Sequence, residues 1–345
     1  MGFRLTRARA AAVAFACSAA LALTACGGGG GSANGSESGG SGDVTVGLTY
    51  IPTIQFAPAY VAEDDGLFEE QGLNATLRHH GADEGLFTAL AAGEEDVVVA
   101  TGDEVLQARG QGMDLVSIGA FFHHYPVVII APDESGIKTI PDLKGKKVGV
   151  PGEYGSSWFG LLFALQSQGM TTDDVDVVSI GFTAQSALAQ GEVDAVMGFK
   201  NNDLVRITQG GQAVHSIPII GHGEPPLIPV SIVTTHKWAK ENPEQAKGVV
   251  EAITRVTQLI IDKPQTAIDS TKTRDDTLVD AEAEASARAV LEQTIPLLKG
   301  PGGKATGKQD LNLWERMGTF MEGVPGLLNE KPDVSQAVTN DYVTT

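Results

Sequence analysis

The residues of this sequence best suited to bind a ligand stand in two polar clusters, each directly after an apolar run. They are Thr101, Gly102 and Asp103 after "DVVVA" (96–100), and Lys200, Asn201, Asn202 and Asp203 after "VDAVMGF" (193–199). Carboxylate, amide and hydroxyl groups exchange hydrogen bonds with polar ligands. Because Asp and Asn are also common helix caps, each cluster taken alone is equally consistent with the start of a helix.

A near-repeat puts the two clusters at equivalent positions. "LAAGEEDVVV" begins at Leu90 and "LAQGEVDAVM" begins at Leu188. Each predicts a helix end, a glycine suited to the left-handed conformation, a short acidic turn and a buried strand. Ligands of parallel α/β sheets bind beyond the carboxyl ends of the strands. We therefore expect residues 101–103 and 201–203 to face one site from two lobes.

The elements that position these clusters are predicted to form two α/β units. Expected strands cover 44–50, 74–80, 96–100, the end of 142–150, 175–181 and 193–199, and expected helices cover 57–72, 82–93, 156–169 and 183–191. Strands that alternate with helices predict parallel sheets with helical crossovers. Residues after about 220 are expected to be mainly helical, with a strand inside 223–235 that returns the chain to the first lobe. The fold class is therefore α/β and bilobal, with hinge crossings near 120–135 and 215–230.

Aromatic residues near the strand ends are candidates to hold a flat ring. Tyr50 and Phe199 are predicted to lie at strand ends of opposite lobes, where they would sandwich a ligand. Tyr125, or its neighbour His124, precedes Pro126 at the expected hinge and is a further candidate to line the cleft.

The stretch "PGEYGSSWFG" (151–160) predicts a loop that enters a helix. The first turn of that helix offers backbone N–H groups, and Ser156 and Ser157 offer hydroxyls, to a partly negative ligand atom. Either serine is equally well explained as the N-cap of the helix. Tyr154 and Trp158 are candidates for stacking, although Trp158 fits a place in the core as well.

No metal or cofactor is expected. The adjacent histidines at 79–80 and 123–124 would point to opposite faces of a strand, so each is a poor chelating pair. Cys17 and Cys26 are the two cysteines of the sequence. Residues after 26 therefore form neither a disulfide nor a cysteine-based metal site.

The charge balance argues against a nucleic-acid partner. The formal net charge is −19, and beyond the first 25 residues 21 Lys and Arg stand against 43 Asp and Glu, a charge of −22. Such an acidic body repels phosphate backbones and anionic lipid surfaces. No segment after residue 26 is long and apolar enough to span a bilayer, so we expect contact with a membrane only through an anchor.

The N-terminal residues have the pattern of a secretory signal. Basic residues in "MGFRLTRARA" precede the apolar stretch "AAAVAFACSAALAL", and "LTAC" (23–26) resembles the lipobox of bacterial lipoproteins. An ordinary cleaved signal with an incidental cysteine is the alternative. We predict a lipoprotein signal peptide over 1–25, then a lipidated Cys26 and a flexible Gly/Ser tether over 26–42. Lobe 1 is predicted over 43–130 and 223–345, and lobe 2 over 131–222.

Three stretches resemble the substrate-binding proteins of ABC importers. They are "YIPTIQFAPAYVAEDDGLFEEQGL" (50–73), "DLKGKKVGVPG" (142–152) and "ALAQGEVDAVMGF" (187–199). The resemblance is to the group of thiamine-pyrimidine-precursor, alkanesulfonate, taurine and nitrate binders, nearest to the pyrimidine-precursor branch. It implies a type II periplasmic-binding-protein fold that closes on a small molecule, with an ABC permease and ATPase as partners.

Two motifs of the pyrimidine-precursor branch are partly matched. The branch typically has an aromatic residue and then Pro-Asn-x-Asp-His-Ala-Pro, where this chain keeps Tyr50, Pro52 and Pro58 but has Thr53, Gln55 and Phe56 in place of Asn, Asp and His. Residues 199–203 resemble the aromatic-basic-Asn-x-Glu run of the branch. The resemblance implies that Asp203 pairs with an amino-heterocycle, and Gln55 is a further candidate contact.

The fungal relatives of this branch are pyrimidine synthases that consume their own histidine. Phe56 stands where that histidine would be. We therefore predict a binding protein and not an enzyme.

The charges of the expected site select among ligands. The site offers Asp103, Asp203, amides and aromatic rings, with Lys200 as the only firm cation. A sulfonate or nitrate site would need an Arg or several donors and no free carboxylate. We expect a neutral or weakly cationic heteroaromatic ligand that carries donors, such as an aminopyrimidine or a vitamin-like precursor.

These observations together predict a monomeric, extracytoplasmic solute-binding protein that is lipid-anchored to the bacterial cell membrane and serves an ABC importer. A binding protein of the sulfonate, taurine or nitrate type is one alternative, and a tethered sensory ligand receiver is another. A pyrimidine-synthase-like enzyme is the remote alternative.

Overall fold

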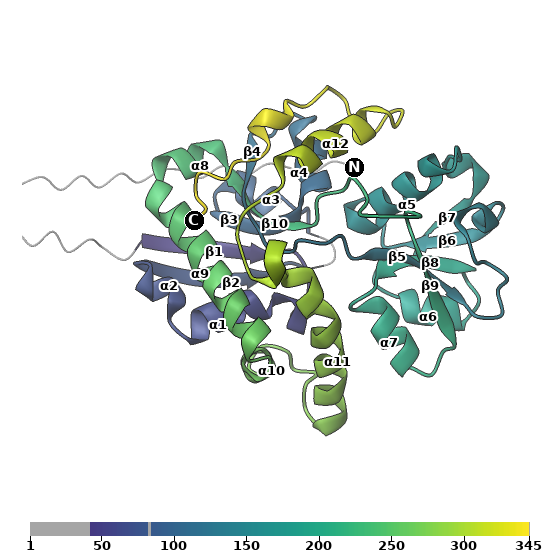
Figure 1. The fold of residues 1–345 in the computed structure, drawn as a ribbon, viewed down its shortest axis with the longest axis horizontal. Coiled ribbons are helices and arrows are strands. Elements are labelled where there is room, and N and C mark those ends of the chain that lie inside the picture. The colour runs from purple at the N-terminus through teal and green to yellow at the C-terminus, as the bar shows by residue number, and fades with distance from the viewer. Residues whose placement is uncertain (1–41, 82–83, 345) are drawn as a thin grey trace, which may run out of the picture. The chain divides into compact units, whose positions relative to one another are not determined.

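The computed structural model describes residues 42–81 and 84–344 (Figure 1). The predicted signal peptide, Cys26 and nearly all of the tether lie outside these residues, as do the first two residues of the helix expected over 82–93. Within the described ranges, no helix is long and apolar enough to cross a membrane.

Two five-stranded sheets form the centres of two lobes (Figure 1). The first has the order β2-β1-β3-β10-β4 and the second the order β7-β6-β8-β5-β9. The strands of the first sheet are β1 (Gly42–Leu48), β2 (Leu73–His79), β3 (Val97–Thr101), β4 (Leu115–Ala120) and β10 (Val230–Thr235). Those of the second sheet are β5 (Val127–Pro132), β6 (Lys147–Val150), β7 (Asp176–Ser179), β8 (Ala195–Phe199) and β9 (Val214–Pro218).

Each sheet contains a parallel group of strands and one strand that runs against its neighbours. β1 pairs in parallel with β2 and β3, and β6 pairs in parallel with β7 and β8. β10 is antiparallel to β3 and β4, and β5 is antiparallel to β8 and β9. The chain passes from the first sheet to the second between 120 and 127 and returns between 218 and 230. The first passage precedes the lobe boundary expected at 130, because β5 already belongs to the second sheet.

Helices connect and cover the strands. They are α1 (Ala57–Asp64), α2 (Leu67–Glu70), α3 (Thr88–Ala92), α4 (Gly102–Arg109), α5 (Gly155–Ser167), α6 (Ala184–Ala189), α7 (Asp203–Gln209), α8 (His236–Glu241), α9 (Pro243–Asp262), α10 (Gln265–Thr271), α11 (Ala281–Leu298) and α12 (Leu311–Glu322). The helix expected over 57–72 is two helices, because Gly66 adopts the left-handed conformation (φ 70°) between them. In the described part of the helix expected over 82–93, which begins at residue 84, only α3 is helical.

Apolar packing joins the two lobes on one side of the molecule. Buried residues of β3 and α4 in the first lobe belong to the same apolar cluster as buried residues of β5, β6 and α5 in the second. Phe163 of α5 meets Phe320 of α12 edge to face, with ring centroids 5.3 Å apart. The two lobes therefore share one apolar core, to which α4, α5 and α12 contribute.

Candidate functional site

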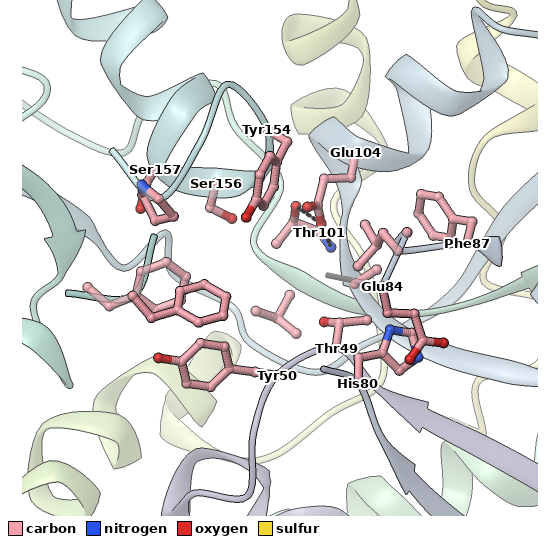
Figure 2. A pocket seen from close by; sticks show the side chains of 18 of the residues that line it. Thr49, Tyr50, His80, Glu84, Phe87, Thr101, Glu104, Tyr154, Ser156 and Ser157 are labelled. Carbon is pink, nitrogen blue, oxygen red and sulfur yellow. Dashed lines mark hydrogen bonds between the residues drawn. The ribbon is translucent and has the colours of Figure 1, made fainter. Parts of the chain in front are cut away.

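A cavity of about 870 Å³ lies where the parallel strands of both sheets end (Figure 2). Part of its lining follows β1, β2 and β3 in the first lobe and β6, β7 and β8 in the second, and other lining residues come from α3, α4, β10 and the segment after β4. The strand-end positions are Tyr50, His80, Thr101, Pro151, Phe182 and Phe199. The cavity thus lies beyond the carboxyl ends of parallel strands, which is where α/β sheets bind ligands.

The structure brings most of the predicted contact residues together around this cavity. Those that line it are Tyr50, Gln55, Tyr154, Ser156, Ser157, Phe199, Asn202 and Asp203. Gly102, Asp103 and Tyr125 do not line it. Lys200, expected to be the cation of the site, is exposed and is also absent from the lining.

Aromatic rings of both lobes meet at the cavity. The rings of Tyr50 and Phe182 are in edge-to-face contact, with centroids 4.7 Å apart and an interplanar angle of 73°. Further rings come from Phe56, Phe87, Phe121, Phe122, Tyr154 and Phe199. Burial, together with the nearby carboxyl of Asp203, raises the pKa of Tyr50 to about 12, so its hydroxyl keeps its proton at neutral pH. Phe182 was missed from the sequence, although it directly follows a predicted strand end at Gly181.

Asp203 is the first residue of α7, and Asn202 holds the N-cap position. Asp203 Oδ2 accepts a hydrogen bond from the Phe199 N–H at 2.7 Å, which ties the start of α7 to the end of β8. Burial raises the pKa of Asp203 above its ordinary value. The side chain therefore closes the turn after β8 and also lines the cavity.

The two asparagines of this cluster point in different directions. Asn201 is fully buried, and its Nδ2 donates to Thr294 Oγ1 of α11 at 2.9 Å. It therefore contacts the C-terminal helices, whereas its neighbour Asn202 lines the cavity and accepts a hydrogen bond from Arg206 Nε.

Asp103 is fully buried behind the cavity wall and joins three neighbours. Oδ1 accepts from the Glu104 N–H at 2.9 Å and from the Thr101 hydroxyl. The Tyr125 hydroxyl oxygen lies 2.9 Å from Asp103 Oδ2 and 2.8 Å from the carbonyl oxygen of Ser156. Tyr125 therefore links α4 of one lobe to the start of α5 in the other.

The contacts of Tyr125 indicate a protonated Asp103. A hydroxyl carries one proton, and a carbonyl oxygen only accepts. Both contacts of the Tyr125 hydroxyl are hydrogen bonds at the same time if Asp103 is protonated. Asp103 then donates its proton to the Tyr125 oxygen, and the Tyr125 hydroxyl donates to the Ser156 carbonyl oxygen. In agreement, burial and the neighbouring Glu104 raise the pKa of Asp103 to about 7.

Gly102 has a packing reason for being glycine. A Cβ atom at this position would lie 2.4 Å from Cβ of Ile228 and 2.9 Å from the ring of Trp314. The start of α4 can therefore approach the returning crossover and α12 only without a side chain.

We expect Gly102→Ala to lower the free energy of unfolding by about 1–3 kcal/mol, the usual cost of overpacking a core. Urea denaturation would measure it. Gly221→Ala is the matched control, because nothing lies within 4 Å of a Cβ at Gly221. Equal stability of the two variants would contradict the packing role of Gly102.

Glu104 is a cavity residue that the sequence reasoning missed. Its Oε2 accepts from the Thr101 N–H at 3.1 Å and lies 2.8 Å from the Thr101 hydroxyl oxygen. The stretch "TGDE" (101–104) could have predicted this position, because Thr followed three residues later by Glu is the pattern of a capping box, in which the Glu side chain turns back to the N-cap residue. Burial raises the pKa of Glu104.

The cavity is acidic. Glu84, Glu104 and Asp203 line it, and the described lining residues include neither Lys nor Arg. At one end, Arg78 forms ion pairs with Glu84 and with the buried Glu95, both at 2.7 Å. An anionic ligand would thus meet carboxylates without a facing cation.

The histidines are engaged in separate contacts. His80 lines the cavity and places Nε2 2.8 Å from Glu95 Oε1, whereas His79 contacts the Tyr60 hydroxyl and the Tyr50 carbonyl. His123 contacts the Thr306 carbonyl, and His124 contacts Glu224. Among the described residues, no group of three or more His, Cys, Asp or Glu is arranged to hold a metal ion.

The chain has two α/β lobes, each with one antiparallel strand, and the strand ends of both lobes lie at a shared cavity. This is the bilobal, type II periplasmic-binding-protein fold. The predicted fold class is confirmed. The alkanesulfonate-binding protein SsuA from Xanthomonas axonopodis pv. citri bound to MOPS has a similar structure, with a TM-score of 0.68 and 20% sequence identity over 86% of this chain and 98% of that one.

The chain belongs to the NMT1/THI5-like family, whose sequence model matches residues 53–267, more than half of the chain. The riboflavin-binding protein RibY of Chloroflexus aurantiacus is 30% identical over 306 residues, which cover 87% of this chain and 86% of that protein. The 4-amino-5-hydroxymethyl-2-methylpyrimidine phosphate synthase of Aspergillus parasiticus is 25% identical over 224 residues, 62% of this chain and 65% of that protein. The resemblance seen in the sequence is thus confirmed, and the relatives include a protein named for binding and a protein named as a synthase.

Proposed function

We propose that this protein is an extracytoplasmic solute-binding protein that captures a neutral, flat heteroaromatic ligand of flavin size between its lobes and delivers it to an ABC importer. The observation that carries the proposal is the composition of the cavity. Both lobes contribute aromatic rings to the lining of the cavity. The described lining also contains the carboxyl groups of Glu and Asp residues but neither Lys nor Arg.

The size of the cavity favours a ligand larger than one ring. Its volume of about 870 Å³ lies in the upper part of the range of roughly 300–1,000 Å³ that small-molecule sites occupy. A single pyrimidine would leave most of that space empty, whereas three fused rings with a polar chain would fill much more of it. The similarity to a riboflavin-binding protein over most of both chains supports the same size class.

The charges disfavour a sulfonate. A buried sulfonate requires cationic or multiple N–H donors, and the carboxylates of Glu104 and Asp203, which no Lys or Arg of the described lining offsets, would repel it. The likeness to SsuA, at 20% identity, concerns the fold alone.

An aminopyrimidine is the second candidate ligand. Asp203 favours it, because a carboxyl group at the cavity wall suits an amino-heterocycle that donates hydrogen bonds. The same carboxyl group accepts equally well from a ring N–H of a larger heterocycle. Asp203 therefore does not distinguish the two ligands, and the choice between them depends on their size.

Catalysis is not part of the proposal. Phe56 occupies the position of the histidine that the resembling synthases consume, and it is a buried phenyl ring at the cavity wall that has no ring nitrogen to supply. A lipid on Cys26 is proposed to hold the protein at the outer face of the cell membrane as a monomer. A sensory receiver would use the same cavity with a different membrane partner.

Titration of the purified protein with riboflavin is expected to quench the flavin fluorescence in a saturable manner, because Tyr50 and Tyr154 line the cavity and a tyrosine ring in contact with a flavin quenches it. The comparison ligands are 4-amino-5-hydroxymethyl-2-methylpyrimidine and MOPS, measured by calorimetry. The flavin should be recovered unchanged. Tight binding of MOPS or of the pyrimidine, without binding of riboflavin, would contradict the proposal.

A further inference from the structure

We propose that Glu104 selects ligands that present a ring N–H beside a carbonyl oxygen, the edge of a cyclic imide, where α4 of one lobe faces the start of α5 in the other. This inference rests on the proposed function. It names the part of the ligand that the cavity recognises and a residue that determines specificity.

The first argument is the position of the Glu104 carboxylate. Oε2 accepts from the Thr101 N–H at 3.1 Å and lies 2.8 Å from the Thr101 hydroxyl oxygen, whose proton is donated to Asp103 Oδ1. Oε1 points toward the other lobe, because a Cβ atom at Gly155 would lie 3.2 Å from it. Glu104, Thr101, Tyr154 and Ser156 face one another across the cavity (Figure 2). The carboxylate thus reaches the first turn of α5 from the opposite lobe.

The second argument is the state of Ser156. Its side chain lines the cavity and is 94% buried as a residue, and its Oγ has no hydrogen-bond partner among the described residues. Neither serine caps the helix, since α5 begins at Gly155 after Tyr154 at the N-cap position, without a side-chain capping bond. Buried hydroxyls normally have partners, so a ligand atom is expected at Ser156.

Together these groups require a particular pattern on the ligand. The first-turn N–H groups of α5 and the Ser156 hydroxyl suit an acceptor, and helix N-termini attract partial negative charge. The Glu104 carboxylate beside them suits a donor and repels a full anion. An acceptor next to a donor on one rigid edge is the C=O and N–H pair of a lactam or imide. The isoalloxazine ring carries such an edge at its N3 position.

Riboflavin and 3-methylriboflavin test this assignment, because the methyl group removes the N3 proton and leaves both carbonyl groups. The protein is expected to bind riboflavin about 10-fold or more tightly than the methylated ligand, the effect of losing a hydrogen bond to a charged group. Glu104→Gln should reduce this preference to about threefold or less, mainly through weaker binding of riboflavin. Measurements at a mildly alkaline pH favour the ionised carboxylate, since burial raises the pKa of Glu104.

Glu153→Gln is the matched control, because it removes an exposed carboxylate just before α5 that does not line the cavity. It should keep the preference for riboflavin. If Glu104→Gln does not fold, Glu104→Asp draws the carboxylate back from α5 and should reduce the preference as well. Equal binding of the two flavins by the unaltered protein, or a preference that survives both Glu104 variants, would overturn the role of Glu104. Binding of neither flavin would instead overturn the proposed function.

Discussion

Asp203→Asn is expected to weaken ligand binding by about 1.5–3 kcal/mol, roughly 10- to 150-fold in Kd, the range for a hydrogen bond to a charged group. Asp203 lines the cavity, so one carboxyl oxygen is available to a ligand N–H while Oδ2 accepts from the Phe199 N–H at 2.7 Å. In the variant, the amide oxygen can keep the bond to Phe199. The amide NH₂ would then face the cavity, where a donor on the ligand meets another donor.

Calorimetry or flavin fluorescence would measure this loss, with circular dichroism to check that the variant is folded. Asp176→Asn is the matched control, since Asp176 is an exposed carboxylate of the same lobe at the start of β7. Its affinity should equal that of the unaltered protein. An unchanged affinity in Asp203→Asn would leave Asp203 with only its structural role at the start of α7.

The second large effect concerns how the stability of the protein depends on pH. Burial raises the pKa of Asp103 to about 7 in the folded protein, from 3.8 without burial. Between these two values the folded state keeps a proton that the unfolded state has lost, so the free energy of unfolding falls as the pH rises. The contribution is present below about pH 4 and is lost as the pH approaches about 7. Its upper limit is on the order of 4 kcal/mol, at about 1.4 kcal/mol for each pH unit between the two pKa values.

Asp103→Asn should remove this part of the pH dependence. Asn imitates the protonated acid, because its Nδ2 can donate to the Tyr125 hydroxyl while its Oδ1 accepts from the Glu104 N–H. The variant is therefore expected to be at least as stable as the unaltered protein near pH 7 and to lose less stability between about pH 5 and pH 7.

Urea denaturation at several pH values would measure the two slopes. Asp276→Asn, an exposed acid on the C-terminal side of the first lobe, is the control and should keep the slope of the unaltered protein. A steep slope that persists in Asp103→Asn would assign the proton to another group. Glu104 is the first alternative, because burial raises its pKa as well.

Local patterns in the sequence were sufficient to predict the two α/β units. Apolar runs of β-branched residues became β3 and β8, and the glycines of the near-repeat precede them, as at Gly93, which ends α3 in the left-handed conformation. The prediction was wrong for 57–72, where Gly66 interrupts the helix, and too long for 82–93. Such errors arise because helix ends depend on the packing of a few residues, whereas periodicity averages over many.

The rule that ligands bind at strand ends also located the cavity. It placed Tyr50, Phe199 and Asp203 at one site although they are separated by about 150 residues, because parallel strands end at the same edge of each sheet. The rule does not say which side chain of a cluster turns toward that site. Within one cluster Asn202 lines the cavity and Asn201 contacts α11, and this depends on the twist of a single turn.

The sequence by itself determined the fold class, the family and the edge of each sheet where the cavity lies, because these follow from periodicity and from motifs contained in short segments. Only the tertiary structure decided the chemistry of that edge. Glu104 lines the cavity and Asp103 does not, because hydrogen bonds with Tyr125 and Thr101 hold the Asp103 side chain away from the cavity. Glu104 faces Gly155 and Ser156 only because the two lobes pack through α4 and α5, which places residues about 50 positions apart within contact distance. Contacts of that kind leave no pattern in a single sequence, since they depend on how two independently formed units meet.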